Sequence, residues 1–327
     1  ISVPIEEEAL KVVTNPSNGK NMFALGLLAE IYQRDLSIIE KQIAYIFRFK
    51  SKKVIDLNIQ MVKNGMDWAR ENLDFQFDLP SVPATEERLV MNGNQACALG
   101  SVAAGMELCS MYPITPATSV SHELAEFIEN YGGIVHQAED EIAAAGVAIG
   151  ASYAGKVALT VTSGPGMALK TEFLALAIMT EVPLVVLDVQ RGGPSTGLPT
   201  KVEQSDLLSS LYGQPGDAPR VVIAPRSIEE CFHSMVTARR IAETFRTVVI
   251  VLTAAHLATG VQLFPRPDLD DRWQEGPIDL APVPEGLRPY AWDPKTGLSR
   301  RIIPGAPGGA HTVTGLAHDE DSLVSYH

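Results

Sequence analysis

The sequence has few cysteines and no long apolar run. Its three cysteines, Cys97, Cys109 and Cys231, lie far apart and form no C-x-x-C pair. They are too few for a disulfide framework and too scattered for a structural zinc site or an iron–sulfur cluster, so we expect buried thiols in a reducing compartment. No apolar stretch reaches the roughly 18 residues that span a bilayer, and no signal peptide is visible. We therefore expect a cytoplasmic protein without a membrane partner.

Positive charge is also scarce. The chain carries 26 Lys and Arg against 39 Asp and Glu, a formal net charge of −13. This balance argues against a nucleic-acid partner, whose phosphates need cationic side chains. Apolar residues make up 46% and charged residues 20% of the 327 residues, which permits a large core and suggests about two domains.

Several catalytic motifs are missing as well. The sequence has no Walker loop, no G-x-G-x-x-G after a strand and no G-x-S-x-G nucleophile elbow, and His136, His233 and His256 lack metal-ligand spacing to one another. The chain begins with isoleucine and ends without a recognisable tail signal, so we expect it to be a piece of a longer polypeptide.

The first 80 residues have a helical pattern. Apolar residues recur at a spacing of three and four over 21–31, 36–47 and 54–73, with Asn18 or Asn21 as a candidate cap for the first helix. Such helices form either a small bundle or the trailing half of an α/β domain whose strands lie upstream. Residues 75–89, with prolines and a run of charges, indicate a linker.

From residue 88 to about 258 the pattern alternates between strand and helix. Short apolar runs cover 157–161, 183–188, 220–224 and 247–252, and 134–136 is strand-like; the helical segments are 93–106, 119–131, 141–151, 170–179, 205–211 and 228–244. Buried strands that alternate with helices predict an α/β, doubly wound parallel sheet. Residues 259–327 are expected to form an extended arm that leads to a further domain outside this sequence.

Two positions are typical of an anion site and an inward-facing acid. Pro116 fits a first helical turn, which places Thr115 at the N-cap, where its hydroxyl and the free N–H groups can hold a negative group. Glu141 opens a helix of small residues and should point inward beside a ligand-sized gap, whereas Glu139 and Asp140 are explained by a solvated acidic turn.

Two strand exits carry unusual loops at the edge where α/β sheets bind ligands. Residues 162–168 contain Gly-Pro-Gly, which allows close approach to a ligand, although a tight strand–helix turn also explains it. Residues 189–200 begin with Arg191, whose planar fork suits a carboxylate; a solvated surface arginine is the alternative.

Five motifs occur together and in order. They are Asn94-Gln-Ala-Cys-Ala-Leu-Gly100, Tyr112-Pro-Ile-Thr-Pro116, Gln137 to Gly146, Thr162-Ser-Gly-Pro-Gly166 and Arg191-Gly-Gly-Pro-Ser-Thr-Gly-Leu-Pro199. Together they resemble those of the α subunit of thiamine-diphosphate-dependent 2-oxoacid:ferredoxin oxidoreductases. The loop Gly193-Pro-Ser-Thr-Gly-Leu-Pro-Thr200 and the segment 315–320 are more similar to the 2-oxoglutarate branch, and Asn21–Gly26 resembles the end of a γ domain fused ahead of α.

The resemblance implies oxidative decarboxylation of 2-oxoglutarate with coenzyme A, giving succinyl-CoA, carbon dioxide and reduced ferredoxin. It implies that Glu141 hydrogen-bonds N1′ of the thiamine diphosphate aminopyrimidine, and that Thr115 and Arg191 hold the substrate carboxylate. Ser163 and Gly164 are expected to contact the cofactor. The second carboxylate of the substrate would be bound by Ser195 and Thr196 or by a partner chain.

The resemblance also implies partners. The diphosphate and Mg²⁺ motif and the cysteines of a 4Fe–4S cluster, both typical of the family, are absent from this sequence. A β subunit is therefore expected to supply them, with homodimeric pairing into an (αβ)2 assembly and ferredoxin as electron acceptor. The alternatives are a different 2-oxoacid, such as pyruvate, indolepyruvate or a branched-chain acid, and a non-catalytic scaffold module.

Overall fold

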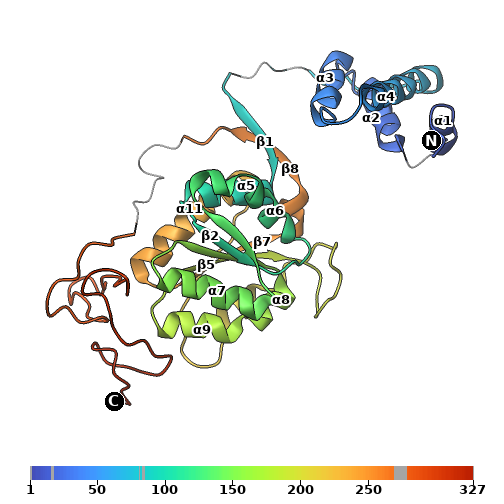
Figure 1. Ribbon diagram of the computed structural model, residues 1–327. Helices are drawn as coiled ribbons and strands as arrows, with labels where there is room; N and C mark the ends of the chain where they lie inside the picture. The colour runs from blue at the N-terminus through green and yellow to red at the C-terminus, as the bar shows by residue number, and fades with distance from the viewer. Residues whose placement is uncertain (1, 16–17, 81, 83–84, 269–277, 327) are drawn as a thin grey trace. The chain divides into compact units, whose positions relative to one another are not determined.

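The chain consists of two compact units, Ile1–Thr85 and Glu86–His327 (Figure 1). This computed structural model describes residues 2–15, 18–80, 82, 85–268 and 278–326. All three cysteines are buried free thiols, as expected from their number and spacing.

The first unit is built from helices α1 (Ile5–Leu10), α2 (Lys20–Ile31), α3 (Leu36–Ile46) and α4 (Lys52–Asn72). The three predicted helices are confirmed to within two residues at each end. The cap of α2 was predicted wrongly: Gly19 precedes the helix with φ of +99°, a conformation that glycine adopts at no steric cost, so neither neighbouring asparagine caps it. A Cβ on Gly26 of α2 would lie 2.0 Å from the Val62 carbonyl oxygen of α4, so these two helices touch backbone to backbone.

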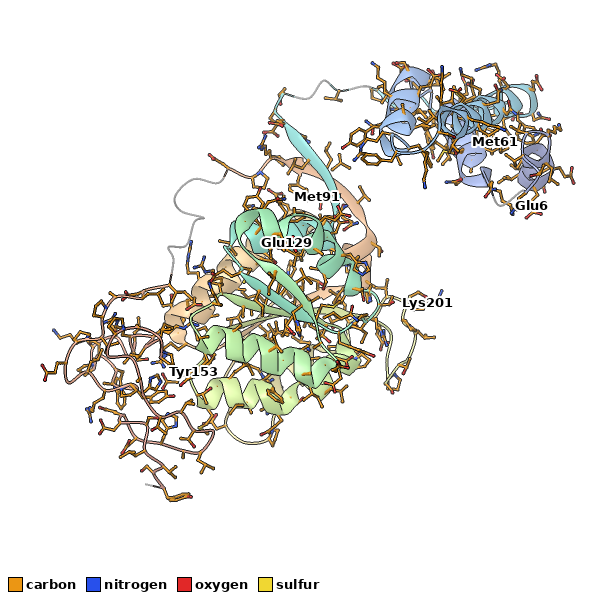
Figure 2. The ribbon with its side chains drawn as sticks, viewed as in Figure 1. Glu6, Met61, Met91, Glu129, Tyr153 and Lys201 are labelled. Carbon is orange, nitrogen blue, oxygen red and sulfur yellow. The ribbon has the colours of Figure 1, made fainter. Side chains whose placement is uncertain are left out.

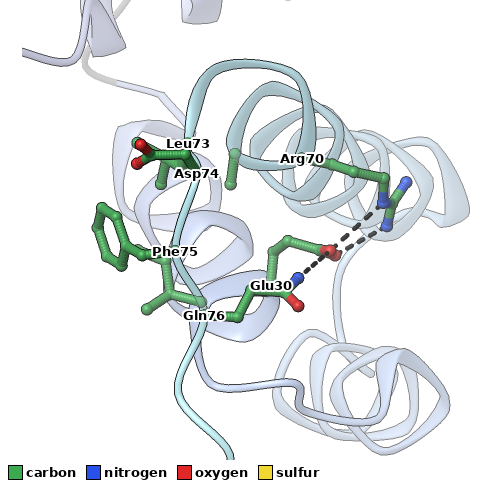
Figure 3. Close-up of a pocket in the computed structure, with 8 residues that line it drawn as sticks. Glu30, Arg70, Leu73, Asp74, Phe75 and Gln76 are labelled. Atoms are coloured by element: carbon green, nitrogen blue, oxygen red, sulfur yellow. Dashed lines mark hydrogen bonds and ion pairs between the residues drawn. The ribbon is translucent and has the colours of Figure 1, made fainter.

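Residues just after α4 are held on this helical unit. Glu30 of α2 accepts hydrogen bonds from Arg70 Nη2 (2.8 Å) and from Gln76 Nε2 (2.9 Å), as Figure 3 shows. The Phe77 backbone N–H donates to the Ile31 carbonyl oxygen at 2.7 Å. Residues 76 and 77 lie inside the predicted linker, but these bonds fix them to α2.

The second unit contains the predicted doubly wound sheet. The described residues form a six-stranded parallel sheet in the order β3-β2-β4-β5-β7-β6. The predicted strands at 134–136, 157–161, 183–188, 220–224 and 247–252 are confirmed, and the short strand β2 was missed. Their bounds are β2 (Leu108–Met111), β3 (Ile134–Gln137), β4 (Ala158–Thr162), β5 (Leu184–Gln190), β6 (Val221–Ile223) and β7 (Val248–Ala254).

Helices cover both faces of this sheet (Figure 1). On one face, α5 (Gly93–Ala103), α6 (Thr118–Phe127) and α11 (Ile228–Phe245) pack on odd-numbered strand residues such as Val161 and Leu187. On the other face, α7 (Glu141–Tyr153), α8 (Gly164–Leu169) and α9 (Thr171–Met179) pack on even-numbered residues such as Val186. The remaining helices are η1 (Ile128–Tyr131), α10 (Leu207–Tyr212) and α12 (Ala255–Thr259).

A separate two-stranded antiparallel ribbon was not predicted. Strand β1 (Arg88–Asn92) pairs with β8 (Val261–Pro265), so the end of the expected linker and the start of the expected arm are strands. Residues 278–326, as far as the structure describes them, contain neither helix nor strand. They are anchored to the domain where Arg301 Nη1 donates to the Glu243 carboxylate at 2.6–2.7 Å. Tyr153, labelled in Figure 2, ends α7 beside this arm, with its ring 6.0 Å from that of His311.

The parallel strands bring the loops after them to one edge. Thr162 at the end of β4 is in register with Asp188 of β5, and Met111 at the end of β2 is in register with Val161. The loops that follow β2, β4 and β5 therefore start side by side, at the edge where open α/β sheets bind ligands.

Candidate active site

The predicted pair Thr115 and Arg191 is brought together at this edge. Arg191 follows β5, is only 7% exposed, and donates from Nη1 to the Thr115 carbonyl oxygen at 2.6 Å. Its Nη2 donates to the Thr196 carbonyl oxygen at 3.0 Å, which excludes the alternative of a solvated surface arginine. The guanidinium thus joins the turn after β2 to the loop after β5, and its binding of a substrate carboxylate remains a prediction.

The predicted N-cap at Thr115 is wrong. Helix α6 begins at Thr118 with Ala117 at the N-cap, and the exposed Thr115 lies in the turn before it. Contacts with residues distant in the sequence explain the difference. Asn94 Nδ2 of α5 donates to the Pro116 carbonyl oxygen at 2.9 Å, and Arg191 Nη1 donates to the Thr115 carbonyl oxygen. These contacts hold residues 115 and 116 in a turn, which local sequence rules do not reveal.

Ser195 and Thr196 lie exposed on the loop after β5, which projects from the domain and carries Lys201 (Figure 2). The loop closes on itself where the Leu198 N–H donates to the Gly192 carbonyl oxygen at 2.8 Å. The hydroxyl groups of Ser195 and Thr196 are therefore accessible to a ligand, and their role in binding a second carboxylate stays a prediction.

Glu141 is the first residue of α7, as predicted. The preceding Asp140 caps the helix, because its Oδ1 accepts a hydrogen bond from the Ala143 N–H at 2.7 Å. The side chain of Glu141 is partly buried and lies against the start of α8, where a Cβ on Gly166 would be 2.8 Å from Glu141 Cγ. Only a glycine at 166 leaves room for the carboxylate in this position.

Ser163 connects β4 to α8, and Gly164 is the first residue of α8, so the two form the β4–α8 turn with its helix start. Ser163 is fully buried, and its Oγ has no hydrogen-bond partner among the described residues. A Cβ on Gly164 would lie 2.8 Å from both carboxylate oxygens of Asp206. Asp206, which the sequence analysis missed, therefore approaches this turn closely, and burial raises its pKa.

Two buried ionisable residues next to the site were not predicted from the sequence. Lys170 and Asp188 are both inaccessible to solvent. Burial lowers the pKa of Lys170 to about 8, and burial together with the neighbouring Asp206 raises the pKa of Asp188 well above its usual range. Asp188 was visible in the sequence as the carboxylate that ends the apolar run 183–188.

Neither a metal cluster nor a membrane span is found among the residues that the structure describes. No group of three or more His, Cys, Asp or Glu is placed to hold a metal ion there. In the same residues, no helix combines the length and the apolar character needed to cross a bilayer.

Comparison with known proteins assigns the family. The family model described as pyruvate flavodoxin/ferredoxin oxidoreductase, thiamine diphosphate-binding, matches residues 99–325. The 2-oxoglutarate oxidoreductase subunit KorA of Mycobacterium tuberculosis is 42% identical over 94% of this chain and 48% of that protein. The 2-oxoglutarate synthase subunit KorA of Methanothermobacter marburgensis is 39% identical over 72% of this chain and 62% of that protein.

A solved structure agrees with these matches. The 2-oxoglutarate:ferredoxin oxidoreductase from Magnetococcus marinus, with 2-oxoglutarate, coenzyme A and succinyl-CoA bound, has a TM-score of 0.88 and 36% identity. The match covers 99% of this chain and 56% of that one, so the chain spans about half the length of several relatives. The resemblance carried by the five motifs is confirmed, and the chain belongs to the pyruvate flavodoxin/ferredoxin oxidoreductase family with its thiamine diphosphate-binding domain.

Proposed function

We propose that this chain is the α part of a 2-oxoglutarate:ferredoxin oxidoreductase. The reaction joins 2-oxoglutarate and coenzyme A into succinyl-CoA, releases carbon dioxide and a proton, and passes two electrons to ferredoxin. The observation that carries the proposal is the contact of Arg191 with Thr115 at the sheet edge. The 36% identity over 99% of the chain to a 2-oxoglutarate:ferredoxin oxidoreductase supports the choice of substrate.

The residues at the edge fit thiamine diphosphate. Glu141 offers a carboxylate acceptor beside Gly166, and the buried Ser163 Oγ has no hydrogen-bond partner among the described residues. The Glu141 carboxylate would accept a hydrogen bond from N1′ of the aminopyrimidine and so hold a proton at N1′. Ser163 and Gly164 would contact the cofactor. Bound thiamine diphosphate supplies the carbanion chemistry that decarboxylation of a 2-oxoacid requires.

Arg191 and Thr115 would bind the carboxylate that leaves as carbon dioxide. The guanidinium is already directed to the Thr115 turn, and a carboxylate would replace one of the two carbonyl oxygens that it now contacts. Such charge-assisted bonds orient the substrate as well as attract it. The second carboxylate of 2-oxoglutarate would reach the exposed hydroxyl groups of Ser195 and Thr196, or groups of the partner chain.

A β subunit completes the site in this proposal. It would supply the diphosphate and Mg²⁺ ligands and the 4Fe–4S cluster, and pairing of two αβ units would give an (αβ)2 assembly that reduces ferredoxin. The names of relatives support a partner chain, because each describes one subunit of a larger enzyme. One example is subunit alpha of 2-oxoacid:ferredoxin oxidoreductase 2 of Aeropyrum pernix, which is 35% identical over 90% of this chain.

The test uses the enzyme assembled from the complete α and β chains. We expect 2-oxoglutarate to have a higher kcat/KM than pyruvate or indolepyruvate, because a site built for a second carboxylate rejects substrates that lack one. Glu141→Gln should lower turnover by orders of magnitude with assembly intact. Preference for another 2-oxoacid would reassign the substrate, and a complex without thiamine diphosphate and iron would favour a scaffold.

Variants of Arg191 test the carboxylate assignment. A hydrogen bond to a charged group contributes about 1.5–3 kcal/mol, so Arg191→Ala should lower kcat/KM roughly ten- to a hundredfold. Arg191→Lys should remain impaired because it lacks the planar fork. Lys201→Ala removes a charge from the same loop at an exposed position and is the matched control. If Arg191→Ala weakened cofactor binding and left the substrate KM unchanged, the assignment would be wrong.

A further inference from the structure

Lys170 connects three parts of the domain next to the candidate site: the junction of α8 and α9, the start of α7 and strand β4. Its backbone lies at the junction between α8 and α9, and its side chain is fully buried. Its Nζ donates to the Glu141 carbonyl oxygen at 3.0 Å and to Thr160 Oγ1 of β4 at 3.1 Å. The ammonium group therefore ties the first residue of α7 to the sheet.

The surroundings of Lys170 are acidic. Glu141 and the N-cap Asp140 at the start of α7, Asp188 on β5 and Cys109 on β2 all raise its pKa through their charges, against the larger effect of burial. Both carboxylate oxygens of Asp188 lack a hydrogen-bond partner among the described residues. Lys170 is thus the positive charge that opposes this buried acid.

Stability alone gives no reason for such a lysine. Charged groups taken out of water lose several kcal/mol of hydration, and well-packed apolar residues often replace a buried ion pair at no loss of stability. Buried charged groups with shifted pKa values gather instead at functional sites. Here the lysine contacts the backbone of the residue that is proposed to serve the cofactor.

We propose that Lys170 is a positioning residue, whose ammonium group fixes the first turn of α7 and so directs the Glu141 carboxylate to the cofactor. The proposal rests on the role of Glu141 given above. The exposed N-cap Asp140 holds this turn through the Ala143 N–H, and the buried Lys170 holds it through the Glu141 carbonyl oxygen. With both in place, the carboxylate stays in the space that Gly166 leaves free.

The decisive measurement is a double-mutant cycle on thiamine diphosphate affinity in the assembled enzyme. Lys170→Met should weaken cofactor binding about tenfold or more, the loss expected for a misplaced charged hydrogen bond. In the Glu141→Gln background the same change should have little further effect, because the two residues act through one contact. Lys156→Met, at an exposed lysine paired with Glu107 Oε1 at 2.7 Å, is the matched control and should leave the affinity unchanged.

A pH profile gives a second readout that a purely structural lysine would not affect. As pH rises through about 8, Lys170 loses its charge, and kcat should fall while the substrate KM stays constant. Lys170→Met should remove this limb of the profile. If Lys170→Met does not fold, adding Asp188→Asn replaces the buried acid that faces the lost ammonium group with a neutral amide, and the cycle is measured in that background.

Each outcome decides one proposal. If Lys170→Met weakened thiamine diphosphate binding equally in the wild-type and Glu141→Gln backgrounds, Lys170 would have only a structural role. An unchanged pH profile of kcat in Lys170→Met would lead to the same conclusion. Cofactor binding without turnover of 2-oxoglutarate would overturn the substrate assignment and leave the cycle valid. An assembled enzyme that binds no thiamine diphosphate would overturn both proposals.

Discussion

Replacement of Gly166 by alanine tests the geometry around Glu141 most directly. The added Cβ would lie 2.2 Å from Thr162 Oγ1, 2.8 Å from Glu141 Cγ and 3.1 Å from Glu141 Oε1. Thr162 is fully buried, so its hydroxyl cannot move into solvent. Overpacking of this kind costs about 1–3 kcal/mol, and displacement of a catalytic group by about 1 Å can cost roughly a hundredfold in rate.

We therefore expect Gly166→Ala to lower the free energy of unfolding by about 1–3 kcal/mol, measured in urea, and to lower turnover by about a hundredfold. Gly150→Ala is the matched control: it lies on the same α7 helix as Glu141, and an added Cβ would meet no atom within 4 Å. That change should stabilise the protein by about 0.5–1 kcal/mol and leave turnover unchanged.

A second substitution separates the two contacts of the new methyl group. Thr162→Ala in the Gly166→Ala background removes the contact with Oγ1, so part of the lost stability should return. Turnover should stay low, because the contact with Glu141 Cγ persists. A Gly166→Ala enzyme with wild-type stability and turnover would show that Glu141 does not occupy the position described, and the reasoning would fail.

Further predictions concern the thiols, the helical unit and the buried lysine. Burial raises the pKa of Cys109 to about 12, so its thiolate fraction at pH 8 is only about one in ten thousand, and a thiol reagent should modify the cysteines only after unfolding. Gly65→Ala would place a Cβ 2.1 Å from the Phe23 carbonyl oxygen and should destabilise the helical unit by about 3 kcal/mol or more in urea unfolding, whereas Asn64→Ala should not. The pKa of Lys170 is about 8 in the folded protein and about 10.4 in an unfolded chain, so between these pH values the unfolded chain binds more protons and the free energy of unfolding rises with pH. Between pH 7.5 and 9.5 this contribution is about 2 kcal/mol, and the urea midpoint of Lys170→Met should lack that rise.

The sequence predicted the parts of the fold that depend on local patterns. Runs such as 184–187 and 248–252 are apolar at every position because both faces of the strand are covered, and they became central strands. The ribbon of β1 and β8 was missed because its partners, such as Arg88 and Pro265, are far apart in the chain and mostly exposed. Strand β2 was missed because Cys109 and Ser110 interrupt a run that is only four residues long.

Two residues of the candidate site gave local signals for an anion, Arg191 at the exit of a predicted strand and Thr115 at a predicted helix start. The family resemblance implied that both hold one carboxylate, and the structure joins the two residues by a hydrogen bond of 2.6 Å. The N-cap assignment of Thr115 failed because carbonyl groups of its turn are bound by Asn94 and Arg191, which are distant in sequence. Asp206 was missed because it lies in a polar segment, and only the close approach of Gly164 places it beside the site.

The buried residues Asp188 and Lys170 could have been predicted from the alternation of side chains along the strands, which a search for apolar runs ignores. Successive strand residues face opposite sides of a sheet, so polar side chains at even positions of β4 and β5 lie on one face. Thr160, Thr162 and Asp188 lie on the same face of the sheet. Lys170 covers this face, because its Nζ donates a hydrogen bond to Thr160 Oγ1. The residues at odd positions pack on the other face, against α5, α6 and α11. A lone carboxylate at an even position of a buried strand calls for an opposing cation, and a lysine in the helical connection between β4 and β5 is the first candidate. Asp188 and Lys170 can be found from the sequence in this way, but only the structure shows that Lys170 Nζ also donates to the Glu141 carbonyl oxygen, which connects the lysine to the candidate site.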